Sequence, residues 1–160
     1  MTQPPPISLA LAEMGIPHTV FRHTGQLHSL EQAAEERSQR PEQIVRSILF
    51  RISKGGYLMV LMAGPMQSEW KILRSYLGAN RISMASKEEV LEVTGYQLGA
   101  VAPFGLPQPI RTLVDQSVLA EDNLSMGAGL RNVAILLKST DLIRALGEAE
   151  IGNFCGPDCE

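Results

Sequence analysis

The sequence predicts an α+β fold: a single domain with a mixed, mostly antiparallel β-sheet surrounded by helices. With 160 residues, of which 44% are hydrophobic, the chain can bury one core and is too short for two comfortable domains. Residues 45–52 and 57–63 are rich in apolar and β-branched side chains and flank Ser-Lys-Gly-Gly at 53–56, which indicates a β-hairpin. The other expected helices and strands alternate irregularly, which favours α+β over a doubly wound parallel fold.

Two helices, a strand and a helical turn are expected before the hairpin. Ser8 is a plausible N-cap for a short helix that Gly15 ends. Ser29 and Gln32 have the spacing of a capping box, so a second helix should begin there. The expected elements are a helix at 8–14, a strand at 18–22, a helix at 29–37 and a turn of helix opened by Pro41.

Six further elements are expected after the hairpin. Ser68 is the expected N-cap of an amphipathic helix that ends at Gly78. Ser86 and Glu89 have a second capping-box spacing, and the helix that they begin ends at Gly95. The expected elements are a helix at 68–77, a strand at 81–84, a helix at 86–94, strands at 110–114 and 133–137, and a helix at 139–146.

A glycine- and proline-rich stretch at residues 94–107 is the expected working site. It holds three glycines and two prolines, which neither a helix nor a strand sustains well. Residues 99–105 therefore form a rigid loop in this prediction, and exposed amide N–H groups on such a loop can bind an oxyanion or a carbonyl oxygen. The alternative is a purely structural crossover between a helix and a strand.

Charge and composition exclude several classes of function. The net charge is −3 and the pI about 5.6, so no global basic field is available for nucleic acid, and any such contact has to be local. No run approaches the roughly 18 apolar residues of a membrane helix, and the N-terminus lacks the regions of a signal peptide. We therefore expect a cytoplasmic protein with no membrane partner.

Cys155 and Cys159 form a Cys-x3-Cys pattern near the C-terminus, which could hold a metal or form a disulfide. A zinc site needs about four ligands, and no nearby histidine or second cysteine pair supplies them. We expect no metal and no cofactor, a domain at residues 1–150, and a frayed tail at 151–160.

The usual catalytic motifs are missing: the sequence has no G-x-S-x-G elbow, Walker loop or H-E-x-x-H. His18, His23 and His28 recur every five residues, which matches no single face of a helix or strand. Surface or edge positions are expected, with substrate contact by His23 or His28 as the alternative. Seven cations form either a phosphate-binding rim or a solvated face: Arg46, Arg51, Lys54, Lys71, Arg74, Arg81 and Lys87.

From about residue 8 to 146 the sequence resembles the YbaK/prolyl-tRNA-synthetase-associated domain family, the deacylases that edit mischarged tRNA. The loop pattern G-x-x-x-P at 99–103 is the most diagnostic feature. The features occur in this order: Gly-Ile-Pro-His at 15–18, residues 29–34, Gln-Ile-Val-Arg-Ser-Ile-Leu at 43–49, Leu-Gly-Ala at 77–79, Thr-Gly-Tyr at 94–96, Gly-Ala-Val-Ala-Pro-Phe-Gly at 99–105, Val-Asp at 114–115 and Gly-Ala-Gly at 127–129.

The resemblance implies hydrolysis of an aminoacyl ester in a cleft that accepts the 3′ end of an aminoacyl-tRNA. It implies attack by the substrate's own vicinal hydroxyl and a bound water, so catalysis would depend on positioning and electrostatics. Main-chain amides at 99–102 would hold the ester and polarise its carbonyl. The implied catalytic residues are Arg46, Gly99 and Ala100, and the implied substrate-binding residues are His28, Val101, Ala102, Pro103, Phe104, Gly105 and Gly127.

Two positions depart from the family pattern. Arg46 stands where the family typically has a lysine, so the charge is kept and a proton-transfer role is lost. The alternative for Arg46 is a guanidinium that extends to the surface. Gly127 falls where many members carry a small hydroxyl residue, and Ser125 lies two positions earlier.

The expected function is that of a free-standing deacylase that removes a small wrong amino acid from tRNA. The departures at Arg46 and Gly127 favour an alternative, a binding module of the same fold that holds an aminoacyl-tRNA or nucleotide-like ligand with weakened catalysis. A third hypothesis is an interaction domain that works with an aminoacyl-tRNA synthetase.

Overall fold

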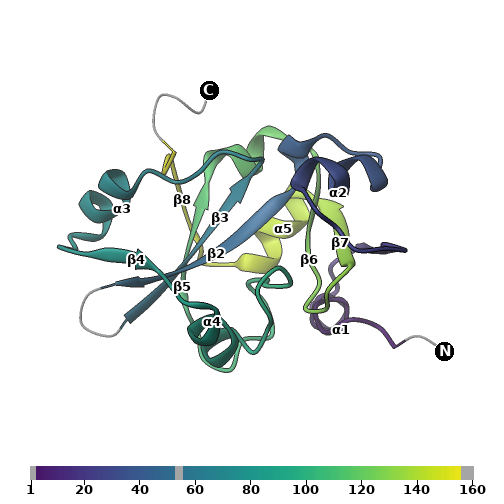
Figure 1. Cartoon of the computed structure of the whole chain (residues 1–160), viewed down its shortest axis with the longest axis horizontal. Coiled ribbons are helices and arrows are strands. Elements are labelled where there is room, and N and C mark those ends of the chain that lie inside the picture. Colours follow the sequence, from purple (N-terminus) through teal and green to yellow (C-terminus); the bar gives the residue numbers. More distant parts are fainter. Residues whose placement is uncertain (1–2, 53–55, 156–160) are drawn as a thin grey trace.

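The computed structural model describes residues 3–52 and 56–155, which form two β-sheets and the helices that cover them (Figure 1). The α+β class with mostly antiparallel pairing is confirmed. The strands are β1 (Thr19–Arg22), β2 (Val45–Ile52), β3 (Gly56–Ala63), β4 (Ile82–Met84), β5 (Arg111–Asp115), β6 (Asn123–Gly127), β7 (Val133–Lys138) and β8 (Glu150–Gly152). The helices are α1 (Pro6–Glu13), α2 (Leu30–Glu36), α3 (Trp70–Leu77), α4 (Lys87–Thr94) and α5 (Ser139–Leu146), with 3-10 turns at Pro41–Gln43 and Gln116–Ala120.

The strands divide between a large sheet in the order β4-β2-β3-β5-β8 and a small sheet in the order β1-β7-β6. The pairs β3–β5 and β5–β8 are parallel, and the other pairs are antiparallel. The expected hairpin is β2–β3, with Val45 opposite Ala63 and Ile52 opposite Gly56. Its predicted loop includes residues 53–55, which lie outside the described residues. The sequence predicted a single sheet, and this prediction is wrong because the strands form two sheets.

The two sheets meet at one parallel bridge between Ile44 and Ser125. The Gly64 N–H donates to the Ile44 carbonyl (2.8 Å), so by the alternation of an antiparallel ladder the main-chain groups of Val45 and Ser47 point away from β3. The same alternation applies to β6, because the Ser139 N–H donates to the Asp122 carbonyl (2.9 Å). The main chain of Ser125 and Gly127 thus points away from β7, and the free edges of β2 and β6 face each other beyond the bridge.

Two apolar cores hold the layers together. The larger core lies between the two sheets and includes α1, α4 and α5 together with the loop after α4. The smaller core lies under α3, on the other face of the large sheet, around Phe50, Leu73 and Phe154. The chain segment that follows α4 is thus part of the main core, and this position fixes its main chain next to β6.

Most predicted helix ends are confirmed. Ser86 and Glu89 make both bonds of the capping box, and Gly95 ends α4 in the left-handed region with φ +80°. The Ser29 hydroxyl accepts the Gln32 N–H (3.0 Å) and begins α2. Ser8 is not an N-cap: α1 begins after Pro5, because proline is well suited to the first turn of a helix.

The C-terminal segment does not fray from residue 151 as expected. Strand β8 pairs with β5, and Phe154 is 1% exposed in the smaller core. The Phe154 N–H also donates to the Asp115 carboxylate (2.8 Å). Cys155 is buried as well, whereas Cys159 and the question of a metal or disulfide at this pair lie outside the described residues. Among the described helices none is long and apolar enough to cross a bilayer.

Candidate active site

A cavity of about 370 Å³ lies at the free edges of β2 and β6, between the loop after α4 and helix α2. Much of its lining is apolar. The polar groups come from a few residues at the ends of α2, on β2, in the loop after α4 and in the loop between β6 and β7. The lining residues are Leu27, Ser29, Leu30, Ala33, Arg37, Ile44, Val45, Arg46, Ser47, Leu98, Gly99, Val101, Met126, Gly127, Asn132 and Val133.

One side of the cavity is made by Gly99, Val101 and Gly127, which we call the main-chain wall. Gly99 has φ +93°, in the left-handed region that favours glycine. Within the described part of the chain, the N–H groups of Gly99 and Val101 make no hydrogen bond. Two main-chain donors beside the cavity are therefore without a protein partner among the described residues, and their contact with substrate stays a prediction.

Gly127 is required for the close approach of this loop to β6. A Cβ atom at Gly127 would lie 2.6 Å from the Val101 carbonyl oxygen and 3.1 Å from that of Ala100. No side chain fits there without moving the loop, because real Cβ contacts are longer than this. Gly127 thus lets the loop lie directly on the strand.

The loop is held in place from behind. The Ala100 N–H donates to the Gln97 carbonyl (2.9 Å), and the Ala100 carbonyl accepts from Gly129 (3.0 Å). The Tyr96 hydroxyl donates to the Phe104 carbonyl (2.6 Å), and its ring is buried. Gly105, with φ +66°, leaves room for that hydroxyl, which lies 2.5 Å from the position of an added Cβ. These contacts make the loop a fixed part of the core.

Several predicted site residues do not line the cavity. The Ala100 amide is already bonded to Gln97, so the prediction that it donates to substrate is wrong. Ala102 is fully buried, and Pro103 and Phe104 line a separate hollow of about 300 Å³ next to α5. Gly105 packs against Tyr96 instead. The rigid loop turns into the core after Val101, and no local sequence pattern marks that turn.

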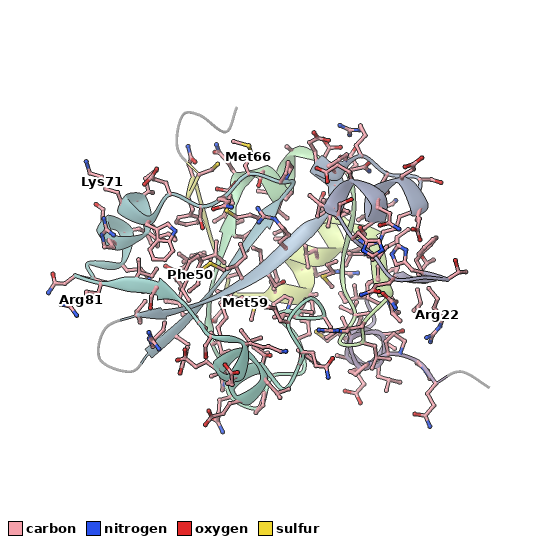
Figure 2. The ribbon with its side chains drawn as sticks, in the orientation of Figure 1. Arg22, Phe50, Met59, Met66, Lys71 and Arg81 are labelled. Carbon is pink, nitrogen blue, oxygen red and sulfur yellow. The ribbon has the colours of Figure 1, made fainter. Side chains whose placement is uncertain are left out.

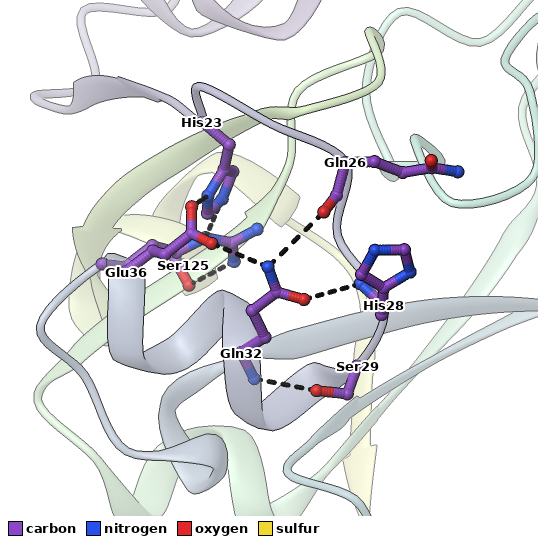
Figure 3. Close-up of polar contacts among 8 residues, drawn as sticks. His23, Gln26, His28, Ser29, Gln32, Glu36 and Ser125 are labelled. Atoms are coloured by element: carbon purple, nitrogen blue, oxygen red, sulfur yellow. Dashed lines mark hydrogen bonds and ion pairs between the residues drawn. The ribbon is translucent and has the colours of Figure 1, made fainter.

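His28 is exposed and lies beside the cavity without lining it (Figure 3). Its main-chain N–H donates to the Gln32 side chain (2.8 Å), and its neighbours Leu27 and Ser29 line the cavity instead. The contact of His28 with substrate therefore stays a prediction.

Arg46 lines the cavity, but its guanidinium is bound to the turn that follows β3. Its Nε donates to the Gly64 carbonyl (2.8 Å), and its Nη2 donates to the Met66 carbonyl. Burial lowers the pKa of this group below its usual value. Of the other six cations of the expected rim, Lys54 is not described and none of the rest lines the cavity; Lys71 and Arg81 point outward near α3 and β4 (Figure 2). Of the six described cations in this set, Arg46 alone lines the cavity.

The cavity lining also includes Arg37, which belongs to a hydrogen-bonded group that the sequence did not predict: Glu36, His23, Arg37 and Ser125, which we call the side-chain network (Figure 3). His23 Nδ1 contacts the Glu36 carboxylate at 2.7 Å, and Arg37 Nε donates to His23 Nε2 (3.0 Å). Arg37 Nη1 donates to the Ser125 hydroxyl (2.9 Å). Arg37 lines the cavity, His23 and Ser125 bind its guanidinium, and Glu36 is linked to it through His23.

Burial and hydrogen bonds shift the pKa values of two groups in this network. Desolvation lowers the pKa of Arg37 to about 10, opposed by the charge of Glu36, so the guanidinium is still protonated at neutral pH. The hydrogen bonds from His23 and then from Gln32 lower the pKa of the exposed Glu36 carboxyl. The network therefore carries one half-buried cation, balanced through His23 by one carboxylate at the surface.

The cavity contains no activated side-chain nucleophile. The Ser47 hydroxyl beside it is buried and has no hydrogen-bond partner in the described part of the chain. The closest approach to a serine–histidine pair is Ser8 with His18 Nε2 (2.7 Å), but neither residue lines this cavity. Among the described residues, no three or more histidines, cysteines and acids are grouped as metal ligands.

The family model of the aminoacyl-tRNA editing domain matches residues 24–145, which include the main-chain wall and, of the side-chain network, Glu36, Arg37 and Ser125. The chain belongs to this family. The resemblance inferred from the sequence is thus confirmed. The predicted reaction, hydrolysis of an aminoacyl ester on tRNA, is confirmed at the level of the family.

Individual relatives of this editing domain support the assignment. The multifunctional Ser/Thr-tRNA deacylase ProXp-y of Escherichia coli (strain K12) is 26% identical over 148 residues, which cover 90% of this chain and 87% of that protein. YwhH of Bacillus subtilis (strain 168), an uncharacterized protein, is 32% identical over 71% of this chain and 72% of its own. Proline–tRNA ligase of Kosmotoga olearia is 31% identical, but the matched segment is only 17% of that enzyme.

Solved structures share the fold of the editing domain. A candidate trans-editing enzyme for prolyl tRNA synthetase superposes with a TM-score of 0.85 at 23% identity, over 93% of this chain and 94% of the other. The hypothetical protein APE2540 superposes with a TM-score of 0.83 at 22% identity, over 92% and 97%. The two-sheet architecture is therefore that of known structures of similar size.

Proposed function

We propose that this editing domain is a trans-acting deacylase that hydrolyses the ester bond of a tRNA carrying a small wrong amino acid. The observation that carries the proposal is the cavity of about 370 Å³ between the free edges of β2 and β6, with the unpaired amides of Gly99 and Val101 beside it. A cavity of this size with a largely apolar lining suits a short aminoacyl side chain.

In this proposal the ester carbonyl oxygen accepts hydrogen bonds from the Gly99 and Val101 amides. These donors stabilise the negative charge that develops on that oxygen when water attacks the carbonyl carbon. The vicinal hydroxyl of the terminal ribose orients the water, the acyl C–O bond breaks, and the ribose oxygen leaves as a hydroxyl. The protein contributes position and electrostatics, which suits a cavity without an activated serine or cysteine.

Gly127 and Arg46 have different roles at the cavity in this proposal. Gly127 lets the loop lie against β6, so the spacing of the two amides is fixed by the main chain. Arg46 holds the turn at Gly64 and Met66 and keeps a positive charge beside the cavity, but it is too basic to act as a proton donor or acceptor at neutral pH. We assign Arg46 a positioning and electrostatic role.

The partners follow from the relatives. ProXp-y is named as a deacylase of Ser- and Thr-tRNA, and several relatives are proline–tRNA ligases. We propose the 3′ end of an aminoacyl-tRNA as the substrate and a synthetase as a further partner that supplies it.

A panel of mischarged tRNAs tests the proposal. Alanyl-, seryl-, threonyl- and cysteinyl-tRNA are incubated with the wild type, with Ser8→Ala and with Arg46→Ala, and the remaining ester is measured over time. We expect hydrolysis of at least one substrate, no change for Ser8→Ala, and a reduced rate for Arg46→Ala.

The possible failures point to different conclusions. Binding of the aminoacyl-tRNA without hydrolysis of any substrate would favour the binding module instead. Loss of hydrolysis in Ser8→Ala, with folding unchanged, would show a side-chain nucleophile and reject attack by water in this cavity.

A further inference from the structure

Arg37 presents unused hydrogen-bond donors at the editing cavity. A guanidinium has five N–H groups, and Arg37 uses one on Nε for His23 and one on Nη1 for Ser125. The other three N–H groups have no partner in the part of the chain that the structure describes. Arg37 is half-buried and lines both the editing cavity and a neighbouring hollow of about 560 Å³ beside Pro17 and Lys138, so a group with a lone pair that is bound in the editing cavity can satisfy them.

The surroundings of Arg37 fix the direction of its guanidinium. His23 accepts from Arg37 through Nε2, so its proton is on Nδ1, where it is donated to Glu36. The His23 side chain is 0% exposed and Ser125 is 0% exposed, so neither partner can turn away to solvent. A cation held from two sides in this way is preorganised for a ligand.

We propose that Arg37 is the residue that determines substrate specificity in the editing cavity, by donating a hydrogen bond to the side-chain hydroxyl of a seryl or threonyl group. This inference rests on the proposed deacylase function. The bound group must be an acceptor, because a guanidinium has only donors. A neutral hydroxyl suffices, because Glu36 already balances the charge of Arg37 through His23.

The apolar lining alone selects weakly. A hydrophobic pocket separates substrates that differ by one small group by only about 10- to 200-fold, whereas a site built to bond a hydroxyl rejects the analogue without it by about 10⁴-fold or more. Serine and alanine differ by one hydroxyl. A deacylase that uses Arg37 therefore hydrolyses seryl-tRNA faster than alanyl-tRNA, and the ratio depends on Arg37.

The test compares seryl- and alanyl-tRNA, made on the same tRNA, as substrates of the wild type, Arg37→Leu, Arg37→Lys and Arg40→Leu. The measured quantity is the ratio of kcat/KM for the two substrates. We expect Arg37→Leu to lower kcat/KM for seryl-tRNA by about 10- to 100-fold and to change alanyl-tRNA by less than about 3-fold. Arg37→Lys keeps the charge without the planar fork and should give an intermediate ratio.

Arg40→Leu is the matched control. Arg40 lies three residues away, its side chain is 62% exposed, it pairs with Glu121, and it does not line the cavity. We expect Arg40→Leu to have the same ratio of kcat/KM for seryl- and alanyl-tRNA as the wild type.

Each other outcome rejects the assignment. Equal loss for both substrates in Arg37→Leu would show that Arg37 is structural, and if that variant does not fold, an unchanged ratio in Arg37→Lys leads to the same conclusion. A wild type that hydrolyses alanyl-tRNA as fast as seryl-tRNA retains the proposed function and removes the role of Arg37. A wild type inactive on both substrates overturns the proposed function and this inference together.

Discussion

Two parts of the cavity lining consist of different groups: main-chain amides in one and side chains in the other. The main-chain wall of Gly99, Val101 and Gly127 has two glycines and presents amide groups, whereas the network of Glu36, His23, Arg37 and Ser125 presents one guanidinium bound by His23 and Ser125. A substitution that causes no steric clash changes a side chain but leaves the main-chain amides in place. The first wall therefore suits the step common to every aminoacyl ester, and the second suits discrimination between amino acids.

The largest effect is expected from Gly127→Ser, which restores a small hydroxyl residue at this position. The added Cβ lies 2.6 Å from the Val101 carbonyl, so the loop must move and the two amides lose their spacing. Displacement of catalytic groups by about 1 Å can cost about 100-fold in rate, and overpacking costs typically about 1 to 3 kcal/mol. We expect kcat/KM to fall by about 100-fold for every substrate.

Gly25→Ala is the control for this variant. No atom lies within 4 Å of a Cβ added at Gly25, so wild-type activity and stability are expected. Full activity of Gly127→Ser, with an unchanged melting temperature, would contradict the close packing of the loop on β6.

A smaller effect is expected in the side-chain network. Ser125→Ala removes the acceptor of Arg37 Nη1 inside the protein, and a hydrogen bond to a charged group contributes about 1.5 to 3 kcal/mol. We expect the free energy of unfolding in urea to fall by this amount. Activity on alanyl-tRNA should change little, because the main-chain wall is untouched.

A double-mutant cycle of Ser125→Ala with Arg37→Leu isolates this contact. If the two residues interact as the structure shows, the double variant is less destabilised than the sum of the single variants, with a coupling of about 0.5 to 3 kcal/mol. Additive effects would mean that the bond between Arg37 and Ser125 contributes nothing to the network.

The smallest effect is expected on stability at low pH. It arises at the start of α4, the helix that precedes the loop of the main-chain wall. Glu89, at the start of α4, accepts from the Ser86 N–H (2.9 Å) and from the Tyr57 hydroxyl (2.8 Å) and pairs with Arg51 (3.0 Å). These contacts, the bond from the Ser86 main chain first, lower the pKa of Glu89 from 4.5 to about 2. A lowered carboxyl pKa stabilises the folded state above pH 4.5, and this stabilisation is lost as the pH falls toward 2.

Melting temperatures measured between pH 6 and pH 2 test this expectation. The wild type should lose more of its melting temperature below pH 4.5 than Glu89→Gln does, because the amide has no proton to gain. Glu88→Gln, at the exposed neighbouring position, should follow the wild type. Parallel curves for the wild type and Glu89→Gln would remove Glu89 as the origin of the acid dependence.

Local patterns predict the elements that depend on neighbouring residues. The hairpin β2–β3 and the capping box at Ser86 and Glu89 follow from propensity and spacing, and both are confirmed. Strand β6 is not predicted, because Asn123 and Gly127 at its ends are poor strand formers and only its pairing with β7 and its bridge to Ile44 make it a strand. Strand β8 is not predicted either, because a short segment near a terminus usually frays.

By itself, the sequence determined the α+β class, the editing-domain family and the position of a stiff glycine and proline loop, because glycine and proline restrict the main chain locally wherever they occur. Only the tertiary structure decided which loop amides are free, that Ala100, Pro103 and Phe104 turn away from the cavity, and that Arg37 lies in it. Arg37 and Ser125 are 88 residues apart, and contacts over such separations arise from the packing of two sheets, which no local pattern records.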